Sequence, residues 1–258
     1  MKHILITNDD GIHAKGIRML SSVLLAAGYT VSMVAPDRNC SGKSHALTLR
    51  KPINLSWINA RETSVQGTPV DCVYLAVNGL LDQRPDMVIS GINAGENLGD
   101  DVIYSGTVAA AREAYLSGIP AMAVSLAGHE CFDTAAHVVL AGLKWCQVLG
   151  HGLLNINVPD CAITELKGLK MTRLGMRDNQ QRPELVMQKV RGDIQCWVGL
   201  PAPPQSFAMA KDYDFGAIAH GYVSVTPLTT DQTCLDTLSR ANLSDFKLDT
   251  GSLSEKMV

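Results

Sequence analysis

The chain has 258 residues, of which 46% are hydrophobic and 18% charged, with 22 Lys plus Arg against 25 Asp plus Glu. This balance of charge offers no basic surface for a nucleic-acid duplex, and an aromatic content of 5% is too low for base-stacking platforms. No apolar run approaches the roughly 18 residues of a membrane span. Residues 1–7 lack a signal peptide's apolar region, and the seven cysteines include no C-x-x-C pair. We therefore expect a cytoplasmic protein with reduced thiols and no membrane contact.

Strand and helix patterns alternate over the first 160 residues. Apolar or β-branched runs predict strands at residues 3–7, 30–35, 87–90, 121–126 and 153–158. Helical spacing, alanine-rich composition or a proline in the first turn predicts helices at residues 17–28, 70–77, 107–116 and 134–149. Because parallel strands need crossover connections, this order predicts a doubly wound α/β fold with a mostly parallel sheet.

The pattern changes after Pro159. Short β-type runs separated by turns fill residues 166–226, and prolines interrupt them at positions 201, 203 and 204. These runs predict a β-rich hairpin extension in the C-terminal third, and residues 232–241 predict a terminal helix. We therefore expect one domain, with its core at residues 1–160, the extension at 161–230 and a C-terminal segment at 231–258.

Two adjacent carboxylates, Asp9 and Asp10, directly follow the first predicted strand. Loops beyond the carboxyl ends of parallel strands form the binding crevice of such a sheet, and carboxylates this close raise each other's pKa unless a cation neutralises them. Ser41 and Asn93, from two later loops at the same edge, could add neutral oxygens, and an all-oxygen set favours Mg²⁺ or Mn²⁺ over Zn²⁺. The alternative is that one aspartate merely caps the following helix, which an Asp-Asp-Gly turn alone would favour.

A second feature is the glycine-rich segment 91–99, after which Ser105, Gly106 and Thr107 open a predicted helix. Backbone N–H groups at a helix start, with Ser and Thr hydroxyls, suit a phosphate. An ordinary Ser or Thr N-cap explains the same residues equally well. The segment lacks the Gly-Lys-Ser/Thr ending of a Walker A loop, and the first turn lacks the G-x-G-x-x-G pattern of dinucleotide-binding folds.

The loop after the second predicted strand carries Arg38, Lys43 and His45, which could meet a substrate phosphate. For Arg38 and Lys43, a solvated loop charge is the simpler interpretation. A structural hydrogen bond explains His45 at least as well as proton transfer does. Cys40 has no His–Cys motif to support a reactive thiol.

Short segments in a fixed order form a specific pattern: Ile6-Thr7-Asn8-Asp9-Asp10-Gly11, Ala35-Pro36-Asp37-Arg38-Asn39, Ser41-Gly42, Gly67-Thr68-Pro69-Val70-Asp71-Cys72, Ser90-Gly91-Ile92-Asn93-Ala94-Gly95, Tyr104-Ser105-Gly106-Thr107-Val108 and Gly221-Tyr222-Val223-Ser224-Val225-Thr226-Pro227-Leu228. Together they resemble the SurE family of stationary-phase survival nucleotidases, over nearly the whole chain. The surroundings of Cys40 and the segment 231–234 depart from the family pattern, which bears on substrate preference and assembly rather than on the metal.

This resemblance implies a Rossmann-like core with a β-hairpin extension. It also implies an enzyme that uses a divalent metal to hydrolyse nucleoside 5′- and 3′-monophosphates, with polyphosphate as a substrate of some members. By motif position, the metal ligands would be Asp9, Asp10, Ser41 and Asn93. Family members are homodimers or homotetramers with C-terminal elements exchanged between subunits.

One mechanistic hypothesis combines these inferences. A single Mg²⁺ or Mn²⁺ per subunit holds the substrate phosphate and activates a water for in-line attack, while Asp9 or Asp10 orients or deprotonates that water. The phosphate oxygens are stabilised by Asn93, Ser105, Gly106 and Thr107, and the catalytic residues are Asp9, Asp10 and Asn93. One alternative is a haloacid-dehalogenase-like phosphatase with an aspartyl-phosphate intermediate, although that class would favour Asp-x-Asp. The other is a non-catalytic nucleotide or metal sensor.

Overall fold

A computed structural model describes residues 2–181, 185–198 and 201–240. The chain separates into two compact units, Met1–Leu228 and Thr229–Val258. The second unit contains α7 (Leu235–Arg240) among its described residues. Within the described residues, no helix is long and apolar enough to cross a bilayer.

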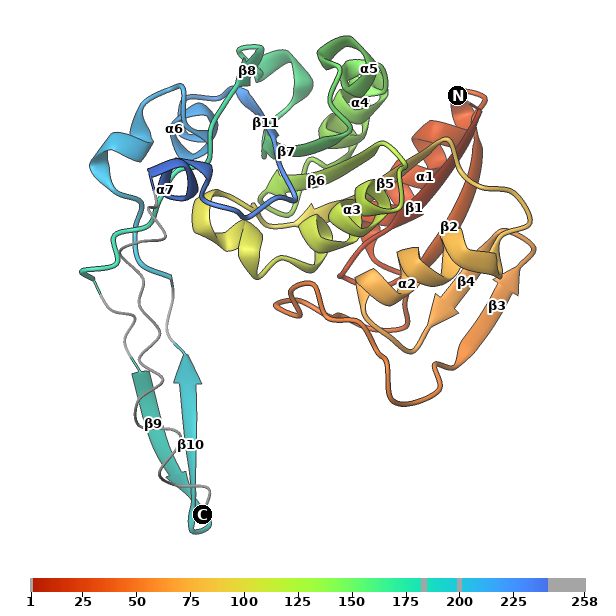
Figure 1. Ribbon diagram of the computed structural model, residues 1–258, viewed down its shortest axis with the longest axis horizontal. Helices are drawn as coiled ribbons and strands as arrows, with labels where there is room; N and C mark the ends of the chain where they lie inside the picture. Colours follow the sequence, from red (N-terminus) through yellow and green to blue (C-terminus); the bar gives the residue numbers. More distant parts are fainter. Residues whose placement is uncertain (1, 182–184, 199–200, 241–258) are drawn as a thin grey trace, which may run out of the picture. The chain divides into compact units, whose positions relative to one another are not determined.

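The first unit is built on a nine-stranded sheet with the order β3-β4-β2-β1-β5-β6-β7-β11-β8 (Figure 1). Its strands, in chain order, are β1 (His3–Thr7), β2 (Thr30–Pro36), β3 (Leu55–Asn59), β4 (Glu62–Val65), β5 (Met87–Ala94), β6 (Ala121–Ala127), β7 (Leu153–Pro159), β8 (Leu169–Met171) and β11 (Val223–Pro227). The strands from β4 to β7 in this order pair in parallel, whereas β3 and β11 pair antiparallel to β4 and β7. A separate antiparallel hairpin is formed by β9 (Leu185–Val190) and β10 (Asp193–Val198).

Helices cover both faces of this sheet. They are α1 (Lys15–Ala26), α2 (Pro69–Leu75), α3 (Gly106–Leu116), α4 (Phe132–Gly142), α5 (Trp145–Leu149) and α6 (Asp214–Ala219), with the shorter turns η1 (Ala76–Leu80), η2 (Gly99–Ile103), η3 (Ile163–Glu165) and η4 (Ser206–Met209). Alternation along β1 sends Ile4 and Ile6 to a core with α1 and α4, and Leu5 to a core with α2 and α3. The fold is therefore a doubly wound, Rossmann-like α/β layer with an added hairpin.

The strand order changes direction between β1 and β5. The chain leaves β1 for β2 on one side, and β5 pairs with β1 on the other, with Thr7 opposite Ser90. At such a switch point, the loops after the two central strands diverge and leave a crevice at the carboxyl edge. Asp9 and Asp10 follow β1, and Asn93 belongs to the end of β5, so the topology places them at this crevice.

The five strands predicted in the first 160 residues are confirmed, but the predicted helix at 134–149 is wrong as one element. It is divided into α4 and α5 by a turn at Leu143 and Lys144. The elements β3, β4 and α6 were not predicted, because they are short and carry mixed polar and apolar residues.

Segment 161–230 contributes to the fold in two ways. Its strands β8 and β11 extend the main sheet, and β9 and β10 form the separate hairpin. Of the predicted terminal helix at 232–241, the structure has α7, and residue 241 lies outside the described residues, as does the rest of the expected C-terminal segment up to residue 258.

Candidate active site

The turn after β1 is closed by the side chain of Asn8. Its Nδ2 donates to the carbonyl of Gly11 at 2.9 Å, and the Gly11 N–H donates back to Asn8 Oδ1 at 3.2 Å. Gly11 has φ +104°, a conformation that favours glycine. The helix α1 begins after Ala14, and no side chain caps it. Asp9 and Asp10 are therefore fixed on a tight turn and do not act as the helix caps of the simpler interpretation.

Asp9 is nearly fully buried, with 4% of its surface exposed. The Thr107 hydroxyl donates to its Oδ1, and the Cys40 N–H donates to its main-chain carbonyl at 2.7 Å. Burial raises the pKa of Asp9 and the neighbouring charge of Asp10 raises it further, whereas the Thr107 hydrogen bond opposes both. The carboxylate of Asp9 is therefore poorly solvated, which disfavours its ionised form.

Asp10 is held by the two neighbouring loops. The Ala94 N–H donates to its Oδ2 at 3.1 Å, and Asn39 Nδ2 donates to its Oδ1 at 3.4 Å. The same Asn39 accepts the Ser41 N–H at 2.8 Å, which ties Ser41 to Asp10. Burial raises the pKa of Asp10, against the lowering effect of the Ala94 hydrogen bond. All three predicted loops therefore meet at this pair of aspartates.

Gly106 allows α3 to begin close against Asp9. A Cβ at this position would stand 2.9 Å from Asp9 Cβ, 3.0 Å from Asp9 Oδ2 and 3.2 Å from Pro69 Cγ. Because contacts below about 3.0 Å force a neighbour to move, any larger residue would push the helix away from the carboxylate. The glycine therefore brings the N–H groups of the first helical turn next to Asp9.

The predicted phosphate residues have partners within the protein. Ser105 is the N-cap of α3, and its Oγ accepts the Val108 N–H at 3.1 Å, as the simpler interpretation proposed. This bond leaves the hydroxyl proton of Ser105 free to donate. The hydroxyl of Thr107 is engaged by Asp9, so a phosphate role for Thr107 depends on its backbone N–H. The start of α3 can therefore cap its own helix and still donate to an anion.

Asn93 stands at an irregular part of β5. The pairing of β5 with β6 shifts register between Ser90 and Asn93. Asn93 Nδ2 donates to the Gly95 carbonyl at 2.8 Å. Since this bond uses the amide nitrogen, Oδ1 is the atom that Asn93 can offer to a cation.

These residues surround one open cavity of about 530 Å³. Its lining residues are Asp9, Ser41, Gly42, Asn93, Ala94, Glu96, Asn97, Asp101, Tyr104, Ser105, Val198 and Pro201. Asp10 and Thr107 are outside this set but are bonded to it through Ala94 and Asp9. A second cavity of about 560 Å³, at the amino ends of β5 and β7, contains none of the candidate residues.

Several residues that line this cavity were not predicted from the sequence. Glu96, Asn97, Asp101 and Tyr104 lie in the loop that supplied Asn93 and Ser105, so a wider reading of that loop would have found them. Val198 and Pro201 come from the hairpin segment, which lies about a hundred residues further along the chain, and no local signal marks them.

The loop after β2 provides fewer candidate functional groups than its composition suggested. His45 Nε2 lies 2.8 Å from Glu113 Oε2 on α3, a structural contact that ties the loop to this helix. Arg38 and Lys43 are exposed and outside the cavity lining. Cys40 is buried, and burial raises the pKa of its thiol, which disfavours the reactive thiolate.

The donor set fits a hard divalent cation. Among the described residues, the ion pairs do not include Asp9 or Asp10. Nor do three Asp, Glu, His or Cys side chains gather in the described part of the chain in a way that could hold a metal. The two carboxylates with neutral oxygens of Ser41 and Asn93 would make an all-oxygen donor set, of the kind suited to Mg²⁺ or Mn²⁺.

The fold and site together define a Rossmann-like α/β protein with an acidic, oxygen-lined crevice at the switch point of its sheet. The family model described as Survival protein SurE matches residues 4–181. The chain belongs to the SurE family.

Relatives agree over most of the chain. The 5′-nucleotidase SurE of Aeromonas hydrophila subsp. hydrophila is 47% identical over 247 residues, covering 92% of this chain and 95% of that protein. The 5′/3′-nucleotidase SurE of Yersinia pestis is 49% identical over 237 residues, covering 90% and 92%. The crystal structure of the SurE protein from Aquifex aeolicus matches with a TM-score of 0.80 at 36% identity, covering 95% of this chain and 100% of that one.

Proposed function

We propose that this chain is a metal-dependent nucleotidase that hydrolyses nucleoside 5′-monophosphates, and 3′-monophosphates, to nucleoside and phosphate. The observation that carries the proposal is the buried Asp9, which is in none of the ion pairs of the described residues and packs against the start of α3 in one cavity. Such a site combines a place for a divalent cation with donors for a phosphate. The names of the Aeromonas and Yersinia relatives support the substrate class. Short polyphosphate, cleaved at its terminal phosphoanhydride bond, is a further candidate substrate.

We assign Asp9, Asp10, Ser41 and Asn93 to hold Mg²⁺ or Mn²⁺. When bound, the cation supplies positive charge for the phosphate and lowers the pKa of a water. No covalent intermediate on either aspartate is needed.

The protein's own groups would share the remaining work. Asp9 orients the attacking water and accepts its proton, while the Thr107 hydroxyl holds the carboxylate at Oδ1. The N–H groups of Gly106 and Thr107 and the hydroxyl of Ser105 stabilise charge on the equatorial phosphate oxygens as it develops.

Phosphate release from a panel of 5′- and 3′-nucleoside monophosphates tests this proposal. The purified protein should release phosphate with Mn²⁺ or Mg²⁺, and EDTA should abolish release. A non-catalytic sensor would bind nucleotide without releasing phosphate, and a haloacid-dehalogenase-like enzyme would yield a trapped phosphoenzyme. Absence of phosphate with every divalent metal tried would rule the proposal out.

A further inference from the structure

The turn η2 connects the cavity wall to the start of α3. Asp101 is one of the residues that line the cavity. The Asp101 main-chain carbonyl accepts the N–H groups of Tyr104 at 3.0 Å and Ser105 at 3.1 Å. Because Ser105 caps α3, the position of Asp101 sets the position of the helix start against Asp9.

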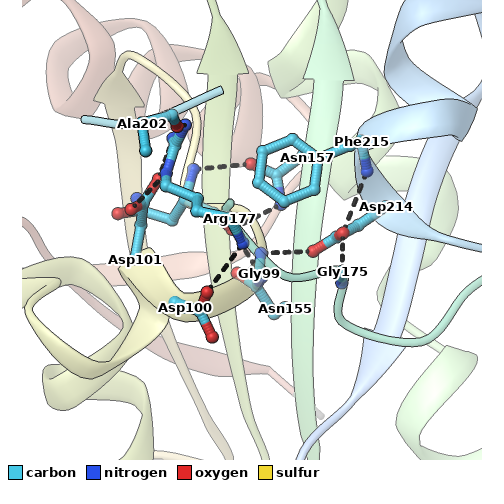
Figure 2. Close-up of polar contacts among 11 residues, drawn as sticks. Gly99, Asp100, Asp101, Asn155, Asn157, Gly175, Arg177, Ala202, Asp214 and Phe215 are labelled. Carbon is cyan, nitrogen blue, oxygen red and sulfur yellow. Dashed lines mark hydrogen bonds and ion pairs between the residues drawn. The ribbon is translucent and has the colours of Figure 1, made fainter. Parts of the chain in front are cut away.

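Arg177, from the segment that leads into the hairpin, holds this turn (Figure 2). Its guanidinium makes a two-point contact with the Asp101 carboxylate, with Nε 2.9 Å from Oδ1 and Nη2 bonded to Oδ2. Its backbone N–H donates to Asp100 Oδ2 at 2.8 Å, and Nη1 donates to the Ala202 carbonyl at 2.8 Å on the returning segment of the hairpin. The guanidinium also stands 5.2 Å from the centre of the Phe215 ring.

The ion pair between Arg177 and Asp101 is largely buried. The side chains of Arg177 and Asp101 are only 18% and 26% exposed, so water screens their charges less than it screens those of a surface pair. The other acidic groups that line the cavity are Asp9 and Glu96. Without its partner, Asp101 would add a negative charge to a cavity that has to admit a phosphate dianion.

We propose that Arg177 is a positioning residue for the reaction: it neutralises the Asp101 carboxylate in the cavity wall and fixes η2, so that the cavity accepts a phosphate dianion at the start of α3. The inference rests on the proposed function. It also makes the base of the hairpin part of the site, because the same guanidinium holds the Ala202 carbonyl.

The loop has other anchors that do not involve this guanidinium. Asp214 Oδ2 accepts the Gly99 N–H at 2.7 Å (Figure 2). Asn157 Oδ1 accepts the Asn97 N–H at 2.8 Å. These bonds remain when the Arg177 side chain is shortened. Replacement of Arg177 should therefore expose the charge of Asp101 without unfolding the segment.

A set of variants separates the charge effect from a purely structural one. In Arg177→Met, KM for a nucleoside monophosphate should rise about tenfold with a much smaller change in kcat, since the repulsion acts on binding. Adding Asp101→Asn should restore most of that loss, and Arg177→Lys, which keeps the charge, should stay close to wild type. The matched control is Arg173→Met, because Arg173 is an exposed arginine paired with Asp212 outside the cavity, and its KM should not change.

Binding of inorganic phosphate, measured by calorimetry with Mg²⁺ present, gives a readout independent of turnover. We expect the affinity for phosphate to be lower in Arg177→Met and to recover in the double variant, in parallel with the changes in KM. The inference is overturned if the double variant binds phosphate as poorly as Arg177→Met, or if Arg177→Met binds as well as wild type. A wild-type protein that binds phosphate but hydrolyses no nucleotide would instead refute the proposed function alone.

Discussion

At the scale of single residues, the site depends on how a buried carboxylate is kept ionised. Asp9 and Asp10 are adjacent, and burial raises the pKa of both. Burial of charge without a counter-charge is unfavourable, which is why we propose a bound cation at this pair. The two aspartates could be selected from the sequence because they end a buried strand. The role of Thr107 could not, because its partner Asp9 is 98 residues away.

Removal of the Thr107 hydroxyl should weaken the site with little change in shape. Thr107→Val deletes the hydrogen bond to Asp9 Oδ1, and a hydrogen bond to a charged group contributes about 1.5–3 kcal/mol. We expect kcat/KM to fall by roughly ten- to a hundredfold. Steady-state kinetics should show that Thr107→Ser, which keeps the hydroxyl, retains most activity. Equal activity of the Val and wild-type proteins would contradict this role.

Metal binding should weaken at acid pH, beginning at a higher pH than for ordinary aspartates. A bound cation requires the carboxylate forms of Asp9 and Asp10, and a raised pKa means that protons compete for them sooner as the pH falls. Titration calorimetry with Mn²⁺ between about pH 8 and pH 5 would measure this competition. Thr107→Val should shift the loss to still higher pH, because the Thr107 hydrogen bond lowers the pKa of Asp9. An affinity that stays constant over this range would argue against a site built on these carboxylates.

At the scale of elements, the segment between β5 and α3 is held mainly by side chains outside the recognisable motifs. The Asn97 carbonyl accepts Nδ2 of Asn155 at 2.9 Å and Nδ2 of Asn157 at 3.0 Å, and Asn97 Nδ2 donates to Ser125 Oγ at 2.7 Å. These partners come from β6 and β7. The sheet therefore anchors the loop between β5 and α3 through polar groups at its carboxyl edge, which suits a site that must keep its donors preorganised.

Asp214 is a second side chain that connects these elements through hydrogen bonds. Its carboxylate accepts three backbone N–H groups, those of Gly99, Gly175 and Phe215, and it is fully buried. Asp214→Ala leaves these donors without an acceptor, at about 1–3 kcal/mol each, so the free energy of unfolding should fall by roughly 3 kcal/mol or more. Urea unfolding would measure it. The control Asp212→Ala, with 63% of the side chain exposed, should change stability by less than about 0.5 kcal/mol; similar losses in both variants would refute the assignment.

At the scale of the whole molecule, the central strands and the loops after them could be predicted from the sequence, because buried apolar runs end there in polar residues. The strands β8 and β11, which extend the sheet at one edge, could not be predicted in this way. β8 has only three residues, and β11 joins beside β7 in antiparallel orientation after about sixty intervening residues, so nothing local marks either pairing. The same reason explains the missed cavity residues Val198 and Pro201, which depend on where the hairpin segment folds back.

Assembly can be tested with the second compact unit. The cores of the described residues lie within residues 1–228, so a chain truncated after Leu228 should still unfold cooperatively on heating. If C-terminal segments are exchanged between subunits, as the resemblance to the SurE family implies, analytical ultracentrifugation should find a dimer or tetramer for the full chain and a smaller species for the truncated one. An unchanged oligomer after truncation would contradict the exchange.

The central claim is that Asp9 anchors a cation that the reaction requires. The most direct measurement compares phosphate release by Asp9→Asn and by Asp37→Asn, an exposed aspartate of the neighbouring loop, at saturating Mn²⁺. The account predicts a loss on the order of a thousandfold or more for Asp9→Asn, and near wild-type activity for Asp37→Asn. Turnover by Asp9→Asn at the wild-type rate would contradict the claim.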